Sequence, residues 1–334
     1  MLCKNTKAIL IFLSTLMFFS GCIGSSTPPS QVKPLPDWIN APLPSENSGF
    51  MYGMAIAQDR ESAIKAALSD MVSKLGTTIE SSYESNEEVR GGFVNSSVKN
   101  QIKSGISKIS INNYEVIKSH KVSYREFAVM VQSDKVKFVN GLKQNLETQK
   151  KAISQKYDSL KGTDALTRYN AKKELSLKAS DLLPNVLIIS ELDKSFDKKK
   201  SLDFIEMKQQ EFLKEAKSLK FYVTGDANSL RFTKSIENYL AQNGFNVTNS
   251  KNAVKIEAKT TDNLNRQGSM QIAVIGLDIS VYDNNQRIGG KSIILKERYN
   301  GSQDSVYKNA AIHLEQDIKS QGINDVIGIN LSLD

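Results

Sequence analysis

The sequence contains few of the residues from which catalytic and metal sites are usually built. Its 334 residues include two histidines, two cysteines and one tryptophan. His120 and His313 lie far apart in the sequence, and no H-E-x-x-H zinc motif, phosphate-binding loop or G-x-G-x-x-G dinucleotide motif occurs. The sequence therefore predicts that the protein is not an enzyme and holds neither a metal ion nor a cofactor.

The remaining fragments of catalytic motifs lack their partners. Ser96–Lys99 and Ser305–Lys308 have the S-x-x-K spacing of penicillin-recognising enzymes, but neither K-T-G nor S-D-N accompanies them. His313 and Glu315 form an H-x-E pair without the P-C-x-x-C of zinc deaminases. Glu87 and Glu88 fall in a polar, loop-like stretch, which is not an apolar setting that would shift the pKa of one carboxylate. Chance explains each fragment, which leaves an envelope hydrolase as the third and least favoured function.

Long apolar runs are scarce, and one lies near the start of the chain. Ala8–Phe19 are apolar except for Ser14 and Thr15, and Lys4 and Lys7 precede them. The run is shorter than the roughly 20 residues that a helix needs to cross a bilayer core of about 30 Å. A positive start followed by a short apolar run is typical of a secretory signal peptide, here residues 1–21.

The end of this signal resembles a bacterial lipobox. Phe19, Ser20, Gly21 and Cys22 carry the resemblance, with Phe19 where leucine is commoner. The resemblance implies cleavage between Gly21 and Cys22, a diacylglyceryl group on the Cys22 thiol and acylation of the new amino end. The alternative is a plain secretory signal with an incidental cysteine.

Residues 22–36 are predicted to be a lipidated, flexible tether. They are rich in Ser, Pro and Gly. Two or more acyl chains anchor a protein stably, since each buried methylene contributes about 0.8 kcal/mol. Ile23, rather than Asp, follows Cys22, so the inner-membrane retention rule of many lipoproteins does not apply. We therefore expect a lipid-anchored protein of the outer membrane that faces the periplasm or the exterior.

Loss of the signal would also change the cysteine count and the charge. Cys3 would leave with it, so no disulfide is expected in the mature protein. Removing Lys4 and Lys7 from the 44 basic residues leaves 42 against 36 acidic ones, a formal charge of +6. This excess suits anionic lipid or glycan surfaces, but no basic stripe with interleaved aromatics indicates nucleic acid. Lys198–Lys200 are expected in a solvated loop.

Residues 37–135 are predicted to form a small α+β domain. Met51–Ala57 read as a buried strand, and Asp59 as the cap of the helix that follows. A weaker helix is expected at 95–108, turn glycines at Gly91-Gly92, and strands at 110–119 and 124–133, where Phe127, Val129 and Val131 alternate on one face. The helix after Asp59 has an apolar stripe formed by Ala63, Ala66, Ala67, Met71, Leu75 and Ile79.

Residues 136–217 are predicted to form an antiparallel helical hairpin. Gly162 and Thr163 make its turn, Pro184 interrupts it, and a further helix covers 201–217. The helix before the turn has a stripe of Phe138, Leu142, Leu146, Ile153, Tyr157 and Leu160. The return stripe is Leu166, Tyr169, Leu175, Ala179 and Leu182, and the further helix turns Leu202, Ile205, Phe212, Leu213 and Ala216 inward. The hairpin is either a spacer or an arm that contacts a partner.

Residues 218–334 are predicted to form a second α+β domain with the order β-α-β-β-β-β-α. A strand at 219–225 leads to a helix that ends near Gly244. Later strands form a hairpin that turns at Asn284 and Asn285, and Gly289-Gly290 are expected in a turn. The last helix, 304–320, carries Val306, Ala310, Leu314 and Ile318. The predicted fold class is α+β, with two small α+β domains joined by the helical hairpin.

Four short motifs in residues 36–135 resemble the Lpp-twenty lipoprotein family. They are Pro36-Asp37-Trp38, Tyr52-Gly53-Met54-Ala55, the alanine-rich helix with Ala63, Ala66 and Ala67, and Phe127–Val131. The family includes flagellar P-type outer-membrane lipoproteins and a lipoprotein antigen. The resemblance implies an N-terminal lipid, a small α+β fold and no known enzymatic activity. This chain continues for about two hundred residues beyond the match and looks like a larger, multi-domain member.

These observations favour a non-enzymatic outer-membrane lipoprotein that scaffolds or adapts a cell-envelope assembly, with a flagellum-associated assembly as the leading candidate. The alternative is a surface-exposed or shed antigen or adhesin that binds host or matrix ligands. Trp38 is expected to pin the tether onto the first domain, with sugar stacking as the alternative. Expected partners are the bilayer, through the acyl chains on Cys22, and an envelope protein. Exposed strand edges would also allow pairing between copies.

Overall fold

We describe the protein from a computed structural model, which covers residues 34–44, 49–89, 96–250, 252–267, 270–299 and 302–333. The described residues divide into two units, one up to residue 42 and the other from residue 43 onward. In the first unit, Asp37–Ile39 form a short 3-10 helix, η1. The second unit contains two sheets and the helices packed on them, so the predicted α+β fold class is confirmed. The proposed division of residues 37–334 into three parts stays a prediction.

The first sheet has three antiparallel strands in the order β1-β3-β2. β1 spans Phe50–Ala57, β2 spans Tyr114–Ser123 and β3 spans Glu126–Asp134. The strand expected at 110–119 thus begins and ends four residues later. β3 is buried on both faces because it is the central strand: Ala128, Val129, Met130 and Val131 are at most 2% exposed.

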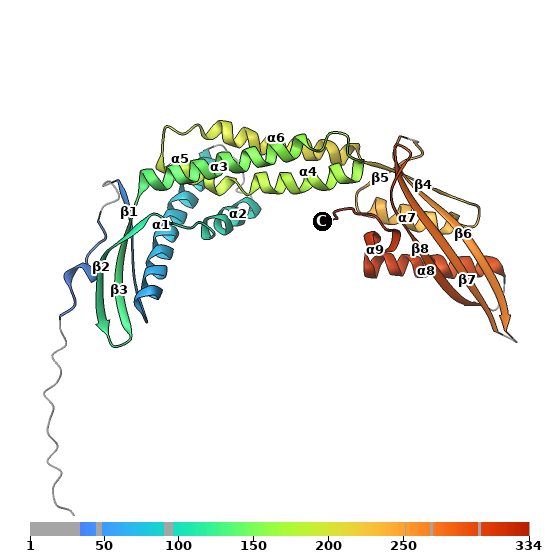
Figure 1. The fold of residues 1–334 in the computed structure, drawn as a ribbon, viewed down its shortest axis with the longest axis horizontal. Helices are drawn as coiled ribbons and strands as arrows, with labels where there is room; N and C mark the ends of the chain where they lie inside the picture. Colours follow the sequence, from blue (N-terminus) through green and yellow to red (C-terminus); the bar gives the residue numbers. More distant parts are fainter. Residues whose placement is uncertain are drawn as a thin grey trace, which may run out of the picture. The chain divides into compact units, whose positions relative to one another are not determined.

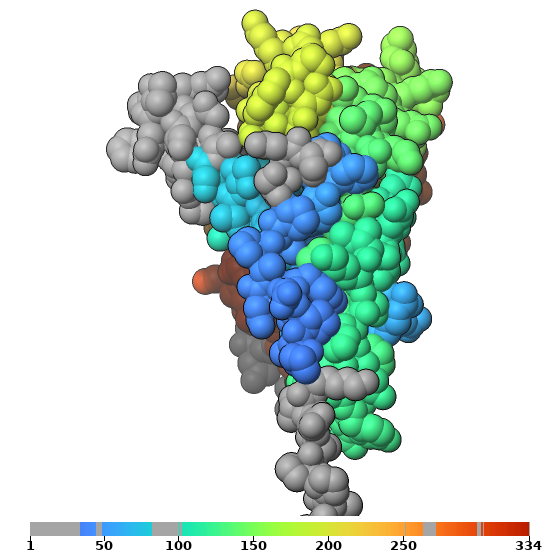
Figure 2. Space-filling view, turned by 90° about the vertical axis from the view of Figure 1, so that its left-hand side faces the viewer, coloured from blue at the N-terminus to red at the C-terminus, as the bar shows by residue number. Residues whose placement is uncertain are grey.

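Two helices accompany this sheet. α1 spans Arg60–Val89 and α2 spans Ser96–Ser107 (Figure 1). Asp59 caps α1, as predicted, by accepting hydrogen bonds from the backbone nitrogen and hydroxyl of Ser62. In Figure 2 the blue segment that includes β1 lies beside the green segment that includes its partner strand β3. The N-terminal core between sheet and helices includes Ala63, Ala67, Met71, Leu75, Ile79, Val129 and Val131.

Four helices follow. α3 spans Lys135–Asp158, α4 spans Ala165–Ser180, α5 spans Leu183–Leu192 and α6 spans Lys198–Ser218. Gly162 has a φ of 82°, which confirms a turn between α3 and α4 that suits glycine. The helical core consists of Val139, Leu146, Ile153, Leu160, Leu175, Ala179, Leu182, Val186, Ile189 and Ile205.

The second sheet has the strand order β5-β4-β6-β7-β8. Its strands are β4 (Lys220–Gly225), β5 (Asn246–Val247), β6 (Val254–Gln267), β7 (Met270–Asp283) and β8 (Gln286–Tyr299). β4 is parallel to β5 and β6, and the other pairs are antiparallel. The predicted turn at Asn284 and Asn285 is confirmed, because both have positive φ, 48° and 65°.

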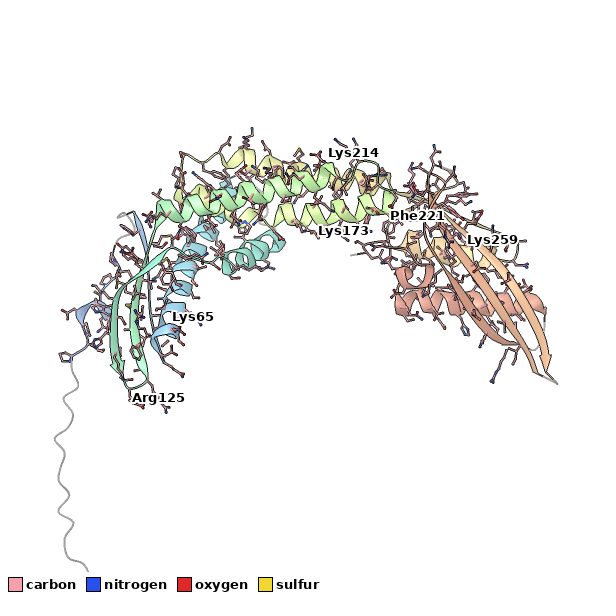
Figure 3. The ribbon with its side chains drawn as sticks, viewed as in Figure 1. Lys65, Arg125, Lys173, Lys214, Phe221 and Lys259 are labelled. Carbon is pink, nitrogen blue, oxygen red and sulfur yellow. The ribbon has the colours of Figure 1, made fainter. Side chains whose placement is uncertain are left out.

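Helices cover the second sheet. They are α7 (Leu230–Gln242), α8 (Gln303–Gln321) and the short α9 (Ile323–Ile327), which the sequence analysis missed. The predicted stripe of α8 is confirmed, since Val306, Ala310, Leu314 and Ile318 are at most 1% exposed. The C-terminal core also contains Phe221, labelled in Figure 3, whose ring meets that of Phe245 edge-on at 5.5 Å.

The C-terminal core extends into the helical segment. Leu166 and Tyr169 of α4 belong to it, and Phe212 and Ala216 of α6 pack against it. Similarly, Phe138 of α3 and two residues of α5 belong to the N-terminal core. α4 and α6 therefore contribute to the C-terminal core as well as the helical core.

Several local predictions were wrong. Glu87 and Glu88 are helical, within α1, because the helix runs ten residues past its apolar stripe. Lys198–Lys200 form the first turn of α6, which Asp197 caps through the backbone nitrogen of Lys200. Leu213 is 46% exposed instead of inward-facing.

Gly289 and Gly290 lie inside β8 instead of a turn. The register of β7 and β8 shifts beside them, at Val281 and Tyr282. The backbone nitrogen of Gly290 donates to the Gly328 carbonyl at 2.8 Å, and side chains at either glycine would clash with neighbouring backbone. Close approach of Gly328 explains Gly289, whereas Gly290 has a φ of 133° and lies against the backbone of Ile279 on β7.

Candidate functional site: an amide-lined groove

The predicted motif residues lie in three places. Gly21, Cys22 and the pair Gly91-Gly92 fall outside the described residues. Pro36 caps η1, and Trp38 lies within it, half-buried. Tyr52 and Gly53 lie side by side in β1.

Gly53 has a packing role. It is buried, and a Cβ built on it would clash with the carbonyl oxygen of Ala67. The absence of a side chain at this position lets α1 lie directly on β1. Tyr52 points to the opposite face of the strand, and its ring lies 6.5 Å from that of Phe50.

The fragments of catalytic motifs do not assemble into a site. His120 lies on β2, whereas His313 lies on α8 with its Nδ1 2.5 Å from the Glu297 carboxylate. Glu315 pairs instead with Lys319 at 2.7 Å. The Ser305 hydroxyl donates to the Ser302 carbonyl at 2.6 Å, within the start of α8. Among the described residues, no group of three histidine, cysteine or acidic side chains is placed to hold a metal ion.

A cluster of charged side chains ties α4 to α6. Glu215 accepts hydrogen bonds from Arg168 at 3.2 Å and from Lys172 at 2.6 Å. Burial lowers the pKa of Lys172, but hydrogen bonds to Glu215 and Tyr157 outweigh it and raise that pKa above its ordinary value. Lys208, 6% exposed, lies 4.0 Å from the centre of the Tyr157 ring. Every charge has a partner, so this cluster positions the helices.

The second unit contains a groove of about 600 Å³ between α2, α3 and the start of α5. The loop from α2 to β2 supplies one wall. A volume of this order is typical of sites that bind small ligands or short segments. The apolar part of the lining consists of Ile109, Phe138, Leu142 and Pro184.

Side-chain amides dominate the polar part of this groove. They come from three segments and are Asn112, Asn113, Asn145, Gln149 and Asn185. Ser104 and Ser110 add hydroxyls, while Lys108 and Asp181 add one charge of each sign. Gln149 donates to Asn145 at 2.6 Å, which orients one pair of amides. Each amide can donate and accept hydrogen bonds, so the groove suits a neutral ligand rich in both kinds of group.

Gly141 of α3 also lines the groove. Glycine in a helix interior costs about 1 kcal/mol relative to alanine. A Cβ added at Gly141 would meet nothing within 4 Å, so packing does not require the glycine. Gly105, on the opposite wall, is different because a Cβ there would clash with Pro184. Gly141 instead leaves open space above the backbone of α3.

The sequence analysis missed this site because its walls lie far apart in the chain. The segments 104–113, 138–149 and 181–185 meet only in the folded structure. The one available signal was Gly141, an isolated glycine in a helical pattern.

The described helices do not include one that is both long and apolar enough to cross a membrane. No family model matches the sequence, and neither does any curated protein. The resemblance to the Lpp-twenty family therefore stays a prediction.

Some solved structures are similar to this chain. The secreted protein HP1454 from the human pathogen Helicobacter pylori is 16% identical, with 83% of this chain and 98% of that chain covered and a TM-score of 0.42. A minor lipoprotein from Acinetobacter baumannii is 13% identical over 33% of this chain and 96% of that chain, with a TM-score of 0.28. Lipoprotein GNA1162 from Neisseria meningitidis is 11% identical over 30% of this chain and 98% of that chain, with a TM-score of 0.22. At these TM-scores the likenesses carry no argument about the present chain.

Proposed function

We propose that the protein is a non-enzymatic lipoprotein of the outer membrane that acts as a scaffold or adaptor in an envelope assembly. The observation that carries this proposal is the sequence Phe19-Ser20-Gly21-Cys22, which follows a short apolar run and precedes a stretch rich in Ser, Pro and Gly. A lipid on Cys22 would hold the chain at the membrane, and the tether would let the folded part stand away from it.

The folded part offers surfaces for contact with other proteins. The groove between α2, α3 and α5 presents several side-chain amides, and the two sheets end in edge strands at β2 and β8. These features support an adaptor role, for which a flagellum-associated structure is the candidate assembly.

The anchor is tested by labelling cells with a clickable palmitate analogue. Wild-type protein and the Cys3→Ser variant should incorporate the label equally, because Cys3 leaves with the signal. Cys22→Ser should lose both the label and the outer-membrane fractionation. Equal labelling of the Cys22→Ser variant would refute the anchor.

The adaptor role needs a separate test. An affinity tag placed after Asp334 allows the protein to be followed through envelope fractions and purified flagellar basal bodies. Enrichment with basal bodies would support the flagellar assembly. An even spread through the outer membrane, together with cleavage when protease is added to whole cells, would favour the surface antigen or adhesin instead.

A further inference from the structure

The chain itself shows how asparagine side chains hold an extended backbone. Near its C-terminal end, Leu331 donates its backbone N–H to Asn324 Oδ1 at 3.0 Å and accepts from Asn324 Nδ2 at 2.9 Å. On the other edge of the same segment, Asn170 Nδ2 donates to the Asn330 carbonyl at 2.8 Å. The backbone nitrogen of Ser332 donates to Asn170 Oδ1, also at 2.8 Å.

The hydrogen bonds from these two asparagines to residues 330–332 resemble those that neighbouring β-strands would make. Successive residues of an extended chain offer their N–H and C=O groups to opposite edges. Asn324 pairs with residue 331 on one edge, and Asn170 pairs with residues 330 and 332 on the other. Lys173, one turn along α4 and labelled in Figure 3, donates to the Ser332 carbonyl at 3.4 Å. Side-chain amides on two helices therefore take part in holding a peptide backbone in this protein.

The groove presents the same chemical groups without an occupant from the described part of the chain. Asn112 and Asn185 make no side-chain hydrogen bond with any described residue. They lie in separate walls, one in the loop before β2 and the other in α5. Amides that line one groove from two walls can pair with the two edges of an extended segment, as Asn170 and Asn324 do.

The other residues that line the groove argue against a sugar and against a ligand with a net charge. Phe138 is only 6% exposed, so its ring does not offer the open aromatic face on which a sugar would stack. Lys108 and Asp181 balance each other, so the groove does not favour a ligand of one charge. The space above Gly141 lets a backbone approach α3 closely, which a side chain at that position would prevent.

We propose that this groove binds an extended segment of a partner polypeptide, a few residues long, through hydrogen bonds from the groove amides to the main chain of that segment. The inference rests on the proposed adaptor role and specifies the chemistry of its partner. Recognition of main-chain groups makes the site tolerant of the side chains in the bound segment.

A phage-displayed library of random dodecapeptides is the probe that tests the proposal. The full folded chain with Cys22→Ser, purified without lipid, is panned against the library with Gly141→Leu as the counter-selection. Enriched peptides are then synthesised with a fluorophore, and their affinities are measured by anisotropy. We expect the wild-type groove to enrich peptides and Gly141→Leu to lose their binding.

Matched variants separate the groove from general effects. Asn112→Ala and Asn185→Ala should each weaken peptide binding by about tenfold, since each leaves a peptide group unpaired. Asn140→Ala and Gln144→Leu are the controls, because both residues are exposed on α3 and lie outside the groove. The circular dichroism of every variant should match that of the wild type.

Other results would overturn the proposal. They are the absence of enrichment over Gly141→Leu, undiminished binding by Asn185→Ala and Asn112→Ala, or binding of chitotetraose in place of peptides. Because the assay uses protein without a lipid, its outcome is independent of the labelling at Cys22. A failure of the groove and a failure of the membrane anchor are therefore distinguishable.

Discussion

Asn170 of α4 binds Ser332, 162 positions later in the chain, through a 2.8 Å hydrogen bond from the Ser332 backbone nitrogen to Asn170 Oδ1. The same side chain donates to the Asn330 carbonyl. One amide therefore fixes the end of the chain to a helix from the middle of the sequence.

Replacing Asn170 with alanine should destabilise the protein by about 1–3 kcal/mol, because two backbone groups lose their partner. Urea unfolding measures the cost, and hydrogen exchange at Ser332 should become faster. Asn228→Ala is the control, since that asparagine is exposed and makes no hydrogen bond with a described residue. Equal stabilities of the two variants would contradict the role of Asn170.

Two glycines should respond oppositely to the same substitution. Gly53→Ala should destabilise by about 1–3 kcal/mol, because the new Cβ would clash with the Ala67 carbonyl. Gly141→Ala should stabilise by about 0.5–1 kcal/mol, because it raises helix propensity where a Cβ meets open space. Thermal unfolding followed by circular dichroism measures both. A neutral Gly53→Ala would mean that α1 can move off the sheet freely.

His313 should stabilise the buried Glu297. Glu297 is 5% exposed, and its Oε1 lies 2.5 Å from His313 Nδ1. Without a proton on Nδ1, that oxygen has no donor among the described residues. His313→Ala should therefore cost about 1–3 kcal/mol in urea unfolding. Adding Glu297→Leu should recover most of the loss, because it removes the unpaired buried carboxylate.

The matched control for this pair is Glu315→Ala. Glu315 lies two residues from His313 but forms an exposed pair with Lys319, so its loss should change stability by less than about 1 kcal/mol. If Glu315→Ala lowered the free energy of unfolding as much as His313→Ala, the claim that His313 specifically stabilises the buried Glu297 would be refuted.

Asp193 follows α5 and pairs with Lys143 of α3. We expect this ion pair, and its contribution to stability, to be lost in acid. A hydrogen bond from Lys143, and further ones from Ser195, lower the pKa of Asp193 to about 2. Because an unfolded aspartate has a pKa of about 3.9, this contribution to stability is present above that pH. It is lost as the pH falls from about 4 towards 2. Lys143→Met should move the pKa of Asp193 back towards its ordinary value.

Carboxyl-detected NMR titration follows Asp193 directly. Lys161→Met is the control, since Lys161 lies near Asp158 and is not among the groups that shift the pKa of Asp193. An unchanged titration of Asp193 in Lys143→Met would show that Ser195 alone holds the carboxylate.

The sequence predicted those features that depend on local spacing or local backbone preference. The apolar stripes of α1 and α8 depend on spacing, and the turn at Asn284 and Asn285 depends on backbone preference. α5 was missed because Val186–Ile189 are all apolar and show no polar face. The helix is buried between two cores: Leu187 and Ile188 belong to the N-terminal core, Val186 and Ile189 to the helical core.

The groove was beyond sequence reasoning for a related reason. Its amides are polar residues in segments that separately read as solvated surface. Their presence in one groove depends on the packing of α2 beside Pro184, which Gly105 permits. Gly105 and Pro184 lie far apart in the sequence, and no short sequence pattern connects them. The role of Gly289 likewise depends on a distant partner, Gly328.

The contribution of α4 to two cores limits how the molecule can be divided. A fragment of residues 218–334 would lack Leu166 and Tyr169, and the ring of Phe245 would lose the tyrosine that packs beside it. It would also lose the hydrogen bond from the Ala165 nitrogen to Asp283 at 2.8 Å. A soluble piece for crystallisation or antibody production should therefore start before Ala165, although the second sheet itself begins only at Lys220.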